Sequence, residues 1–141
     1  MFLGEFQHSL DAKGRVILPV RFREQLEGGG YMAKALDGCL AVYPVAEFTQ
    51  LAAKLGEARE RGPQERQAAR SFFAGAVDST PDKQGRVAIP QSLREYAHLE
   101  REVTVVGSFD HIEIWDAQTF AERDAIGVAA IAQGEGINDF L

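Results

Sequence analysis

Short apolar and alternating runs along the chain predict β-strands that follow one another in the same order in each half. Weak alternation over residues 4–9 is typical of a strand, and runs rich in β-branched or aromatic residues predict more of them. These runs cover residues 16–18, 31–36, 39–43, 77–80, 87–89, 103–106 and 111–115. Asp37-Gly38 is the strongest hairpin signal in the chain. Leu40, Val42, Ile112 and Ile114 are expected to face the core.

Longer segments with apolar residues at helical spacing predict helices around these strands. They cover residues 44–61, 64–75 and 117–133, and shorter helices are expected to begin at Pro19 and Pro90, which suit the first position of a helix. Gly62-Pro63 separates the first two long helices. Strands and helices in this mixture indicate an α+β fold.

The predicted helix over residues 64–75 has two different sides. Arg66 and Arg70 lie on one side, and Phe72-Phe73 lies on the other. A Phe pair at a helix end usually belongs to a core, but a small domain can also bury such a pair between subunits. Both interpretations stay open at this stage.

The main organising feature is a repeat. Residues 11–24 return seventy-one residues later as residues 82–95, and seven of the fourteen positions are identical. The identical pairs are Asp11/Asp82, Gly14/Gly85, Arg15/Arg86, Val16/Val87, Pro19/Pro90, Arg23/Arg94 and Glu24/Glu95. A repeat at a fixed offset indicates one supersecondary unit that is used twice.

Each repeated unit predicts a tight turn, an arginine at its tip, a buried strand and a short helix. Asp followed three residues later by Gly is typical of a turn, because the carboxylate accepts backbone N–H bonds and Gly tolerates a positive φ. Arg15 and Arg86 follow the turns and are expected to project from their tips. An Asp and an Arg that flank a turn can also simply pair and hold the loop. Two copies favour a binding surface built from two equivalent tips.

Charge and composition limit the partners and the cellular location that fit this chain. The net charge is −6, but residues 1–95 carry 13 basic against 12 acidic residues, whereas residues 96–141 carry 2 against 9. Both repeated motifs are therefore locally basic, although the chain as a whole is acidic. No apolar run is long enough to span a membrane, and the N-terminal residues do not resemble a signal peptide, so we expect a cytoplasmic protein.

The sequence offers no constellation for catalysis or metal binding. Cys39 is the single cysteine and is expected to be a small buried apolar residue. His8, His98 and His111 stand apart from one another, without metal-ligand spacing and without an evident partner for general-base chemistry. We therefore predict no catalytic residues, no metal, no cofactor and no small-molecule substrate.

Several motifs in the same order resemble the MraZ family of bacterial transcriptional regulators. They are residues 1–15, 19–23 and 82–90, and His111-Ile-Glu-Ile-Trp-Asp116. Each half is similar to a SpoVT/AbrB-type domain, and the resemblance covers roughly residues 1–125. The resemblance implies two such domains at residues 5–48 and 77–120, a helical connector at 49–76, and a C-terminal helix with an acidic tail at 121–141. It also implies that the halves interlock as a swapped-hairpin β-barrel, a pseudo-dimer within one chain, with flanking helices.

The family resemblance further implies a homo-oligomeric ring that binds short G-rich direct repeats in double-stranded promoter DNA. It implies repression of a division and cell-wall gene cluster that includes its own promoter, and association with the nucleoid. The motif residues would be Asp11, Gly14, Asp82 and Gly85 for the turns, with Arg15 and Arg86 facing DNA. Neighbouring cations that could contact phosphates are Lys13, Arg21, Arg23, Lys83 and Arg94.

Two other function classes compete with a DNA-binding regulator. The same fold also serves in modules that bind partner proteins, and the acidic C-terminal segment would favour a basic partner. An enzyme is disfavoured, because no nucleophile, base and orienting group recur together.

Overall fold

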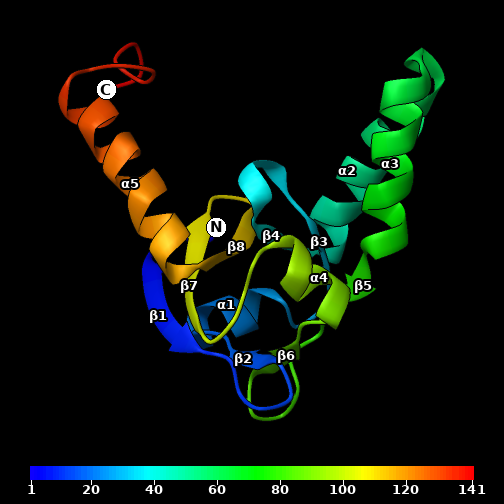
Figure 1. Ribbon diagram of the computed structural model, residues 1–141, viewed down its shortest axis with the longest axis horizontal. Helices are drawn as coiled ribbons and strands as arrows, with labels where there is room; N and C mark the ends of the chain where they lie inside the picture. Colours follow the sequence, from blue (N-terminus) through cyan, green and yellow to red (C-terminus); the bar gives the residue numbers. More distant parts are fainter.

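The computed structural model describes residues 1–141, in which each repeat contributes two short strands, a short helix, a hairpin and a longer helix. The first repeat contains β1 (Glu5–Ser9), β2 (Arg15–Ile17), α1 (Val20–Gln25), β3 (Gly30–Lys34), β4 (Leu40–Pro44) and α2 (Val45–Ala58). The second contains β5 (Val77–Asp78), β6 (Arg86–Ala88), α4 (Gln91–Tyr96), β7 (Glu102–Ser108), β8 (His111–Asp116) and α5 (Ala117–Ala132). A 3-10 turn (Arg59–Arg61) and helix α3 (Pro63–Gly75) connect them (Figure 1).

The two repeats exchange strands with each other. The first strand of each repeat pairs with the hairpin of the other, so β1 lies beside β7 and β5 lies beside β3. The hairpins meet through β4 and β8, which completes an antiparallel sheet in the order β1-β7-β8-β4-β3-β5. Strands β2 and β6 form a separate antiparallel ribbon with Val16 opposite Val87. The predicted α+β class and the interlocking of the halves are confirmed.

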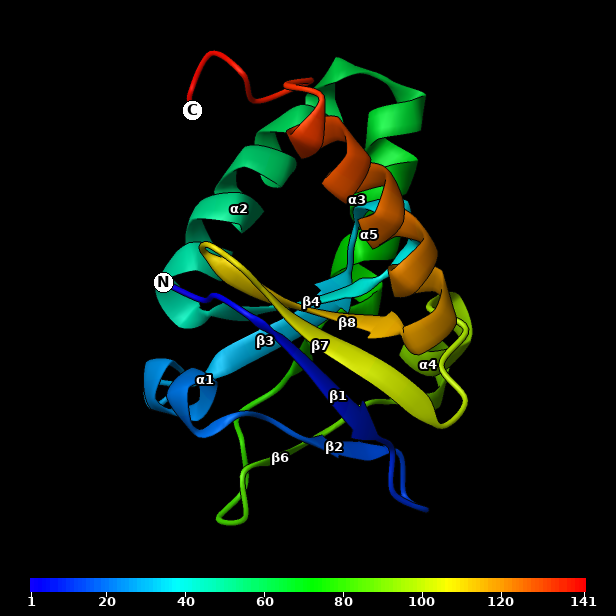
Figure 2. The same cartoon turned by 90° about the vertical axis from the view of Figure 1, so that its left-hand side faces the viewer.

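The core lies between the six-stranded sheet and the β2–β6 ribbon, which Figure 2 shows on one side of the sheet. The four residues predicted to face inward, Leu40, Val42, Ile112 and Ile114, are fully buried. The ring of Phe22 meets those of Phe2 and Phe6 edge to face, at a centroid distance of 5.3 Å in each case. Helix α1 is therefore anchored by aromatic packing against the N-terminal segment.

Proline stands just before the helices rather than inside them. Pro19 and Pro90 have φ of −53° and −59° with extended ψ, and α1 and α4 begin one residue later. The prediction that these prolines occupy the first helical position is wrong by one residue. The proline ring fixes φ, and the extended ψ directs the chain from the ribbon strand toward the start of the helix.

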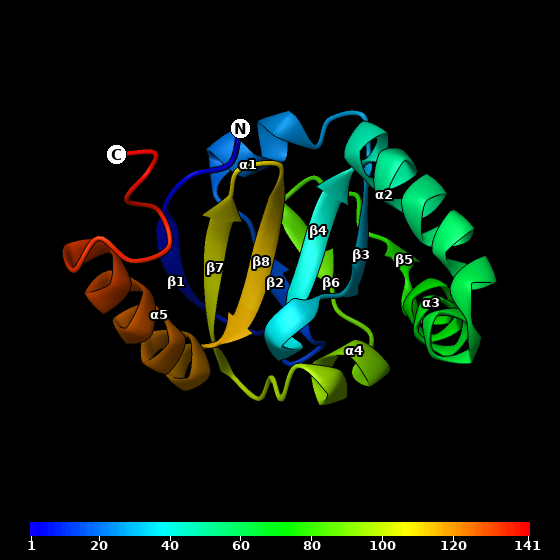
Figure 3. The ribbon, with the colours of Figure 1, turned by 90° about the horizontal axis from the view of Figure 1, so that it is seen from above.

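The long helices lie away from the β2–β6 ribbon. Helices α2 and α3 form a hairpin at one end of the sheet, and α5 projects at the other end (Figures 1 and 3). Both turns that precede the ribbon strands lie at the opposite side of the molecule from these helices, at the bottom of Figures 1 and 2. None of the helices is both long and apolar enough to cross a membrane.

His111 is not isolated, contrary to the sequence analysis. Its ring nitrogens lie 2.7 Å from Asp110 Oδ1 and 3.1 Å from Glu113 Oε2, and its ring packs on that of Tyr43. Burial disfavours the charged imidazole, but the hydrogen bonds to Glu113 and Asp110 outweigh burial and raise the pKa of His111. The carboxylate of Glu113 also accepts a hydrogen bond from Trp115 Nε1.

We expect this histidine to make stability depend on pH. A raised folded-state pKa means that protonated His111 stabilises the fold fully below about pH 6.5, and that this contribution disappears as pH rises through the folded-state pKa. Solvent screening limits the effect to about 0.5–1 kcal/mol. Urea unfolding at pH 6 and pH 8.5 should show a larger loss of stability on going to high pH for the unmodified chain than for His111→Gln. The same pH dependence in both proteins would contradict the assignment.

Candidate nucleic-acid interface

The first turn is closed by the carboxylate of Asp11. Its Oδ1 accepts hydrogen bonds from the backbone N–H groups of Lys13 and Arg15, each at 2.9 Å. Gly14 has a φ of +74° and donates its N–H to the carbonyl of Asp11. The hydrogen bond from the Arg15 N–H is the largest reason why the pKa of Asp11 lies below its usual value, so the carboxylate stays ionised. The predicted Asp-to-Gly turn is present.

The same carboxylate also holds the arginine side chain. Arg15 Nε donates to Asp11 Oδ2 at 2.7 Å, and the Arg15 side chain is 27% exposed. The second turn repeats this arrangement, with Arg86 Nε 2.9 Å from Asp82 Oδ2 and the same exposed fraction for Arg86. Each arginine thus pairs with the aspartate of its own turn, as the alternative interpretation of the sequence allowed, and remains partly exposed. The Nη groups of both make no hydrogen bond or ion pair within the chain.

Each turn is covered by an arginine from the other repeat. The side chain of Arg94 lies over Gly14, and that of Arg23 lies over Gly85, so closely that a methyl group on either glycine would collide with the guanidinium. Arg23 Nε donates to the carbonyl of Leu18 at 2.7 Å, and Arg94 Nη1 donates to the carbonyl of Ile89. Each of these two half-buried arginines thus packs against the turn of the other repeat while bonding to its own repeat.

Sequence reasoning missed this crossed contact, although a signal for it was present. Arg23/Arg94 and Gly14/Gly85 are both identical pairs in the repeat. The crossed arginine–glycine contact could not be predicted without knowing that β2 pairs with β6. Beside this pairing, the Leu18 N–H donates to the carbonyl of Gly85, and the Ile89 N–H donates to the carbonyl of Gly14.

The remaining predicted cations are fully available to a ligand. Lys13, Arg21 and Lys83 are exposed, and their side chains have no hydrogen bond or ion pair within the chain. Lys13 and Lys83 lie within the turns, and Arg21 lies in the first turn of α1. The two turns, which carry Lys13 and Lys83, thus lie at the same side of the molecule, at the bottom of Figure 2.

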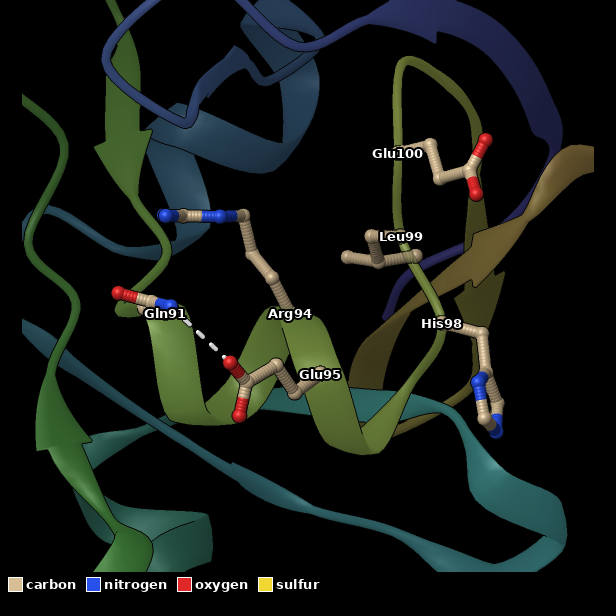
Figure 4. Close-up of a pocket in the computed structure, with 6 residues that line it drawn as sticks. All are labelled: Gln91, Arg94, Glu95, His98, Leu99 and Glu100. Carbon is tan, nitrogen blue, oxygen red and sulfur yellow. Dashed lines mark hydrogen bonds between the residues drawn. The ribbon is translucent and has the colours of Figure 1, made fainter.

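Helix α4 carries a hollow of ≈ 470 Å³ lined by Gln91, Arg94, Glu95, His98, Leu99 and Glu100. Figure 4 shows the Arg94 guanidinium pointing away from His98 and Glu100, while Gln91 donates to Glu95 at 3.0 Å. Its polar groups therefore do not converge on one point, as an active site requires. No group of three or more potential metal ligands gathers anywhere in the chain. Cys39 is buried as predicted, and burial raises the pKa of its thiol to about 12.

Adding a methyl group to either turn glycine should destabilise the protein. Gly14 and Gly85 both have positive φ, which costs a residue with a Cβ roughly 1–2 kcal/mol, and the methyl group would also displace Arg94 or Arg23. We expect Gly14→Ala and Gly85→Ala each to lower the midpoint of thermal unfolding.

Gly38→Ala is the matched control, because Gly38 has a φ of +81° but no neighbouring atoms for the methyl group to meet. The midpoint should fall further for the two turn variants than for Gly38→Ala. Equal losses at all three positions would mean that the crossed arginines add nothing to the turns.

Comparison with known proteins assigns this chain to a family. The model of the MraZ protein family, described as antitoxin-like, matches residues 1–71 and 72–124, which together cover both repeats. A protein from Desulforamulus reducens is 43% identical over 142 residues that span all of both chains. Relatives from Finegoldia magna (44% identical over 86% of this chain and 85% of the relative) and Acetivibrio thermocellus (49% over 82% and 81%) are similar. All three are named transcriptional regulator MraZ, and this chain belongs to the MraZ family.

Proposed function

We propose that the protein is a transcriptional regulator that binds double-stranded DNA through its two Asp-Arg turns. Its targets are short G-rich direct repeats in a promoter, and its effect is repression of a division and cell-wall gene cluster that includes its own promoter. The observation that carries this proposal is the pair of equivalent turns on one side of the molecule. The names of the relatives support regulation of transcription and disfavour an enzyme.

The geometry of each turn suits recognition of guanine. Because Nε of Arg15 and of Arg86 is bound to an aspartate, the outer edge of each guanidinium keeps its two Nη groups for a ligand. Two N–H donors side by side match the O6 and N7 acceptors of guanine in the major groove. The aspartate also fixes the arginine before binding, which reduces the conformational entropy that binding would otherwise cost.

The surrounding cations supply contacts that do not depend on sequence. Lys13, Lys83 and Arg21 carry unpaired charges beside the turns and would lie against phosphates. Arg23 and Arg94 hold the turns in place and offer their remaining N–H groups to the DNA backbone. Helix α5, which carries Glu122 and Asp124, lies on the far side of the molecule from the turns, so these two carboxylates would not repel the DNA directly (Figure 1).

Several protomers are required for tight binding, and a ring-shaped homo-oligomer accounts for direct repeats. A two-fold dimer presents its binding faces in opposite senses and suits palindromes, whereas head-to-tail interfaces present them in the same sense. Such a complex on chromosomal DNA would associate with the nucleoid.

Selection of bound fragments from a random pool of double-stranded DNA tests the proposal. We expect enrichment of G-rich fragments, and we expect direct binding of those fragments to weaken as salt rises, by roughly 0.9 in log K per log salt for each phosphate neutralised. An Arg15→Ala/Arg86→Ala protein in parallel selection should lose the enrichment. A pool that stays unenriched, while the chain retains a protein partner, would favour the alternative of a protein-interaction module.

A further inference from the structure

The β2–β6 ribbon presents a row of side chains on its outer side. Alternate residues of a strand point to opposite faces, and Val16 and Val87 are buried in the core. The residues before and after each valine therefore share the outer face of the ribbon, which turns away from the six-stranded sheet (Figure 2). These outer residues are Arg15 and Ile17 on β2, and Arg86 and Ala88 on β6. The two arginines thus stand on one surface with two apolar neighbours.

The register of the ribbon places one apolar residue directly opposite each arginine. Ile17 lies opposite Arg86, and Ala88 lies opposite Arg15. Residues that face each other in an antiparallel pair have their Cβ atoms about 4.5–5.5 Å apart. Each arginine therefore has an apolar neighbour that the other repeat supplies.

The two apolar neighbours differ in size, although they occupy the same position in the repeat. Each follows the buried valine by one residue, and both are exposed, Ile17 to 45%. A single exposed aliphatic residue is ordinary on a protein surface. Ala88 shows, however, that the ribbon forms with only a methyl group at this position. Packing within the chain therefore does not account for the longer Ile17 side chain.

The position of Ile17 suits contact with a base edge. A two-stranded β-ribbon fits the major groove of DNA, where thymine displays a methyl group that apolar side chains recognise. We propose that Ile17 contacts the methyl group of a thymine that lies one or two base pairs from the guanine bound by Arg86. The spacing follows from the Cβ separation, because successive base pairs are about 3.4 Å apart. This inference rests on the proposed function and adds a specificity-determining residue to it.

Ile17 also gives the DNA motif a direction. The ribbon has approximate two-fold symmetry, because the strands are antiparallel with Val16 opposite Val87. Two equal ends would read the same bases on the two DNA strands, and their site would be a palindrome. The Ala88 side chain is much shorter than that of Ile17, so only the end at Arg86 selects a thymine. A motif that differs at its two ends can form direct repeats that are distinct from inverted ones.

Replacing thymine by deoxyuridine tests this contact, because the exchange removes only the methyl group. The probe is a fragment that the unmodified protein selects from the random pool, made with either thymine or deoxyuridine beside the motif guanine. We expect the unmodified chain to bind the thymine fragment about fourfold more tightly for each motif copy, the effect of burying one methyl group. Ile17→Ala should bind both fragments equally well.

The matched control is Leu36→Ala. It removes an exposed aliphatic side chain from the β3–β4 hairpin, which lies away from the ribbon (Figure 1). This variant should keep the full preference for thymine over deoxyuridine.

The reciprocal variant Ala88→Ile should gain a contact. Both ends of its ribbon carry isoleucine, so selection with this variant should add a thymine beside the guanine bound by Arg15 and bring the motif closer to a palindrome. Selection with Ile17→Ala should lose the thymine and keep the guanines. Urea unfolding should find both variants folded, because each exchange copies the residue that the other repeat carries at this exposed position.

Several results would overturn the role of Ile17. Equal binding of the thymine and deoxyuridine fragments by the unmodified chain, or a selected motif without thymine beside its guanine, would show that no methyl group is read. An Ile17→Ala protein that still prefers thymine would assign the contact to another residue. The G-rich enrichment persists in each of these cases, so the proposed function would stand. A pool that the unmodified chain leaves unenriched would instead overturn both.

Discussion

Replacing both Arg15 and Arg86 by alanine should abolish specific DNA binding while the protein stays folded. Each arginine that contacts a guanine contributes about 1–3 kcal/mol of discrimination, which is roughly 5-fold to 150-fold in the dissociation constant. The loss applies to each protomer of the assembly, so it multiplies when several protomers bind one DNA. The fold should tolerate the change, because a partly exposed ion pair contributes at most about 1 kcal/mol.

Fluorescence anisotropy with a labelled selected fragment measures this loss, and urea unfolding measures the fold. The matched control is Lys54→Ala/Arg61→Ala, which removes two exposed cations from the helical hairpin at the opposite side of the molecule. The control should bind with nearly unchanged affinity. An Arg15→Ala/Arg86→Ala protein that unfolds more easily, yet binds normally per folded molecule, would give both arginines a purely structural role.

Asp11→Ala tests the support of the turn and of its arginine together. The carboxylate closes the turn through backbone N–H groups and also holds the Arg15 guanidinium. Its removal leaves the arginine charge in place but frees its orientation. The pairing of Arg15 with Asp11 is therefore compatible with a role of Arg15 in binding. An arginine that pairs within its own loop can still present its outer edge to a ligand.

The local parts of the fold could be predicted from the sequence, because they depend on neighbouring residues. The hairpin at Asp37-Gly38 is present, with φ of +66° and +81° at these two residues, as its composition requires. The long helices also follow from apolar spacing. The partners of His111 are also local and could have been predicted. Asp110 is adjacent, and Glu113 lies two residues on, the spacing that puts two strand residues on one face.

Long-range contacts could not be predicted from residue patterns alone. The exchange of β1 and β5 between the repeats followed only from the family resemblance, since periodicity does not say which strand a strand pairs with. The crossed arginines depend on that exchange. From the sequence, Arg23 and Arg94 were predicted only as phosphate contacts, and the structure adds that each lies over the glycine of the other repeat.

Affinity should rise steeply with the number of DNA motif copies. One protomer offers few unpaired cations beside its turns, Lys13, Arg21 and Lys83, so a single site should bind like a non-specific protein, with a dissociation constant of about 10⁻⁴–10⁻⁶ M at physiological salt. Once one protomer of an assembly is bound, each further contact is intramolecular. Avidity can then exceed the single affinity by about 10²–10⁴ without any new kind of contact.

DNA carrying one, two or three copies of the selected motif tests this argument, together with a three-copy fragment whose spacing is increased by about 5 base pairs, half a helical turn. The half-turn insertion rotates alternate motifs to the opposite side of the duplex, where a rigid assembly cannot reach them, so most of the gain should disappear. A variant held as a monomer supplies the protein-side control, because it keeps both turns but presents them one protomer at a time. We expect this variant to bind three copies no more tightly than one, apart from the statistical factor of about three. If the unmodified protein binds one copy as tightly as three, or if the monomeric variant binds as well as the assembly, recognition resides in a single protomer and the multivalent mechanism is wrong.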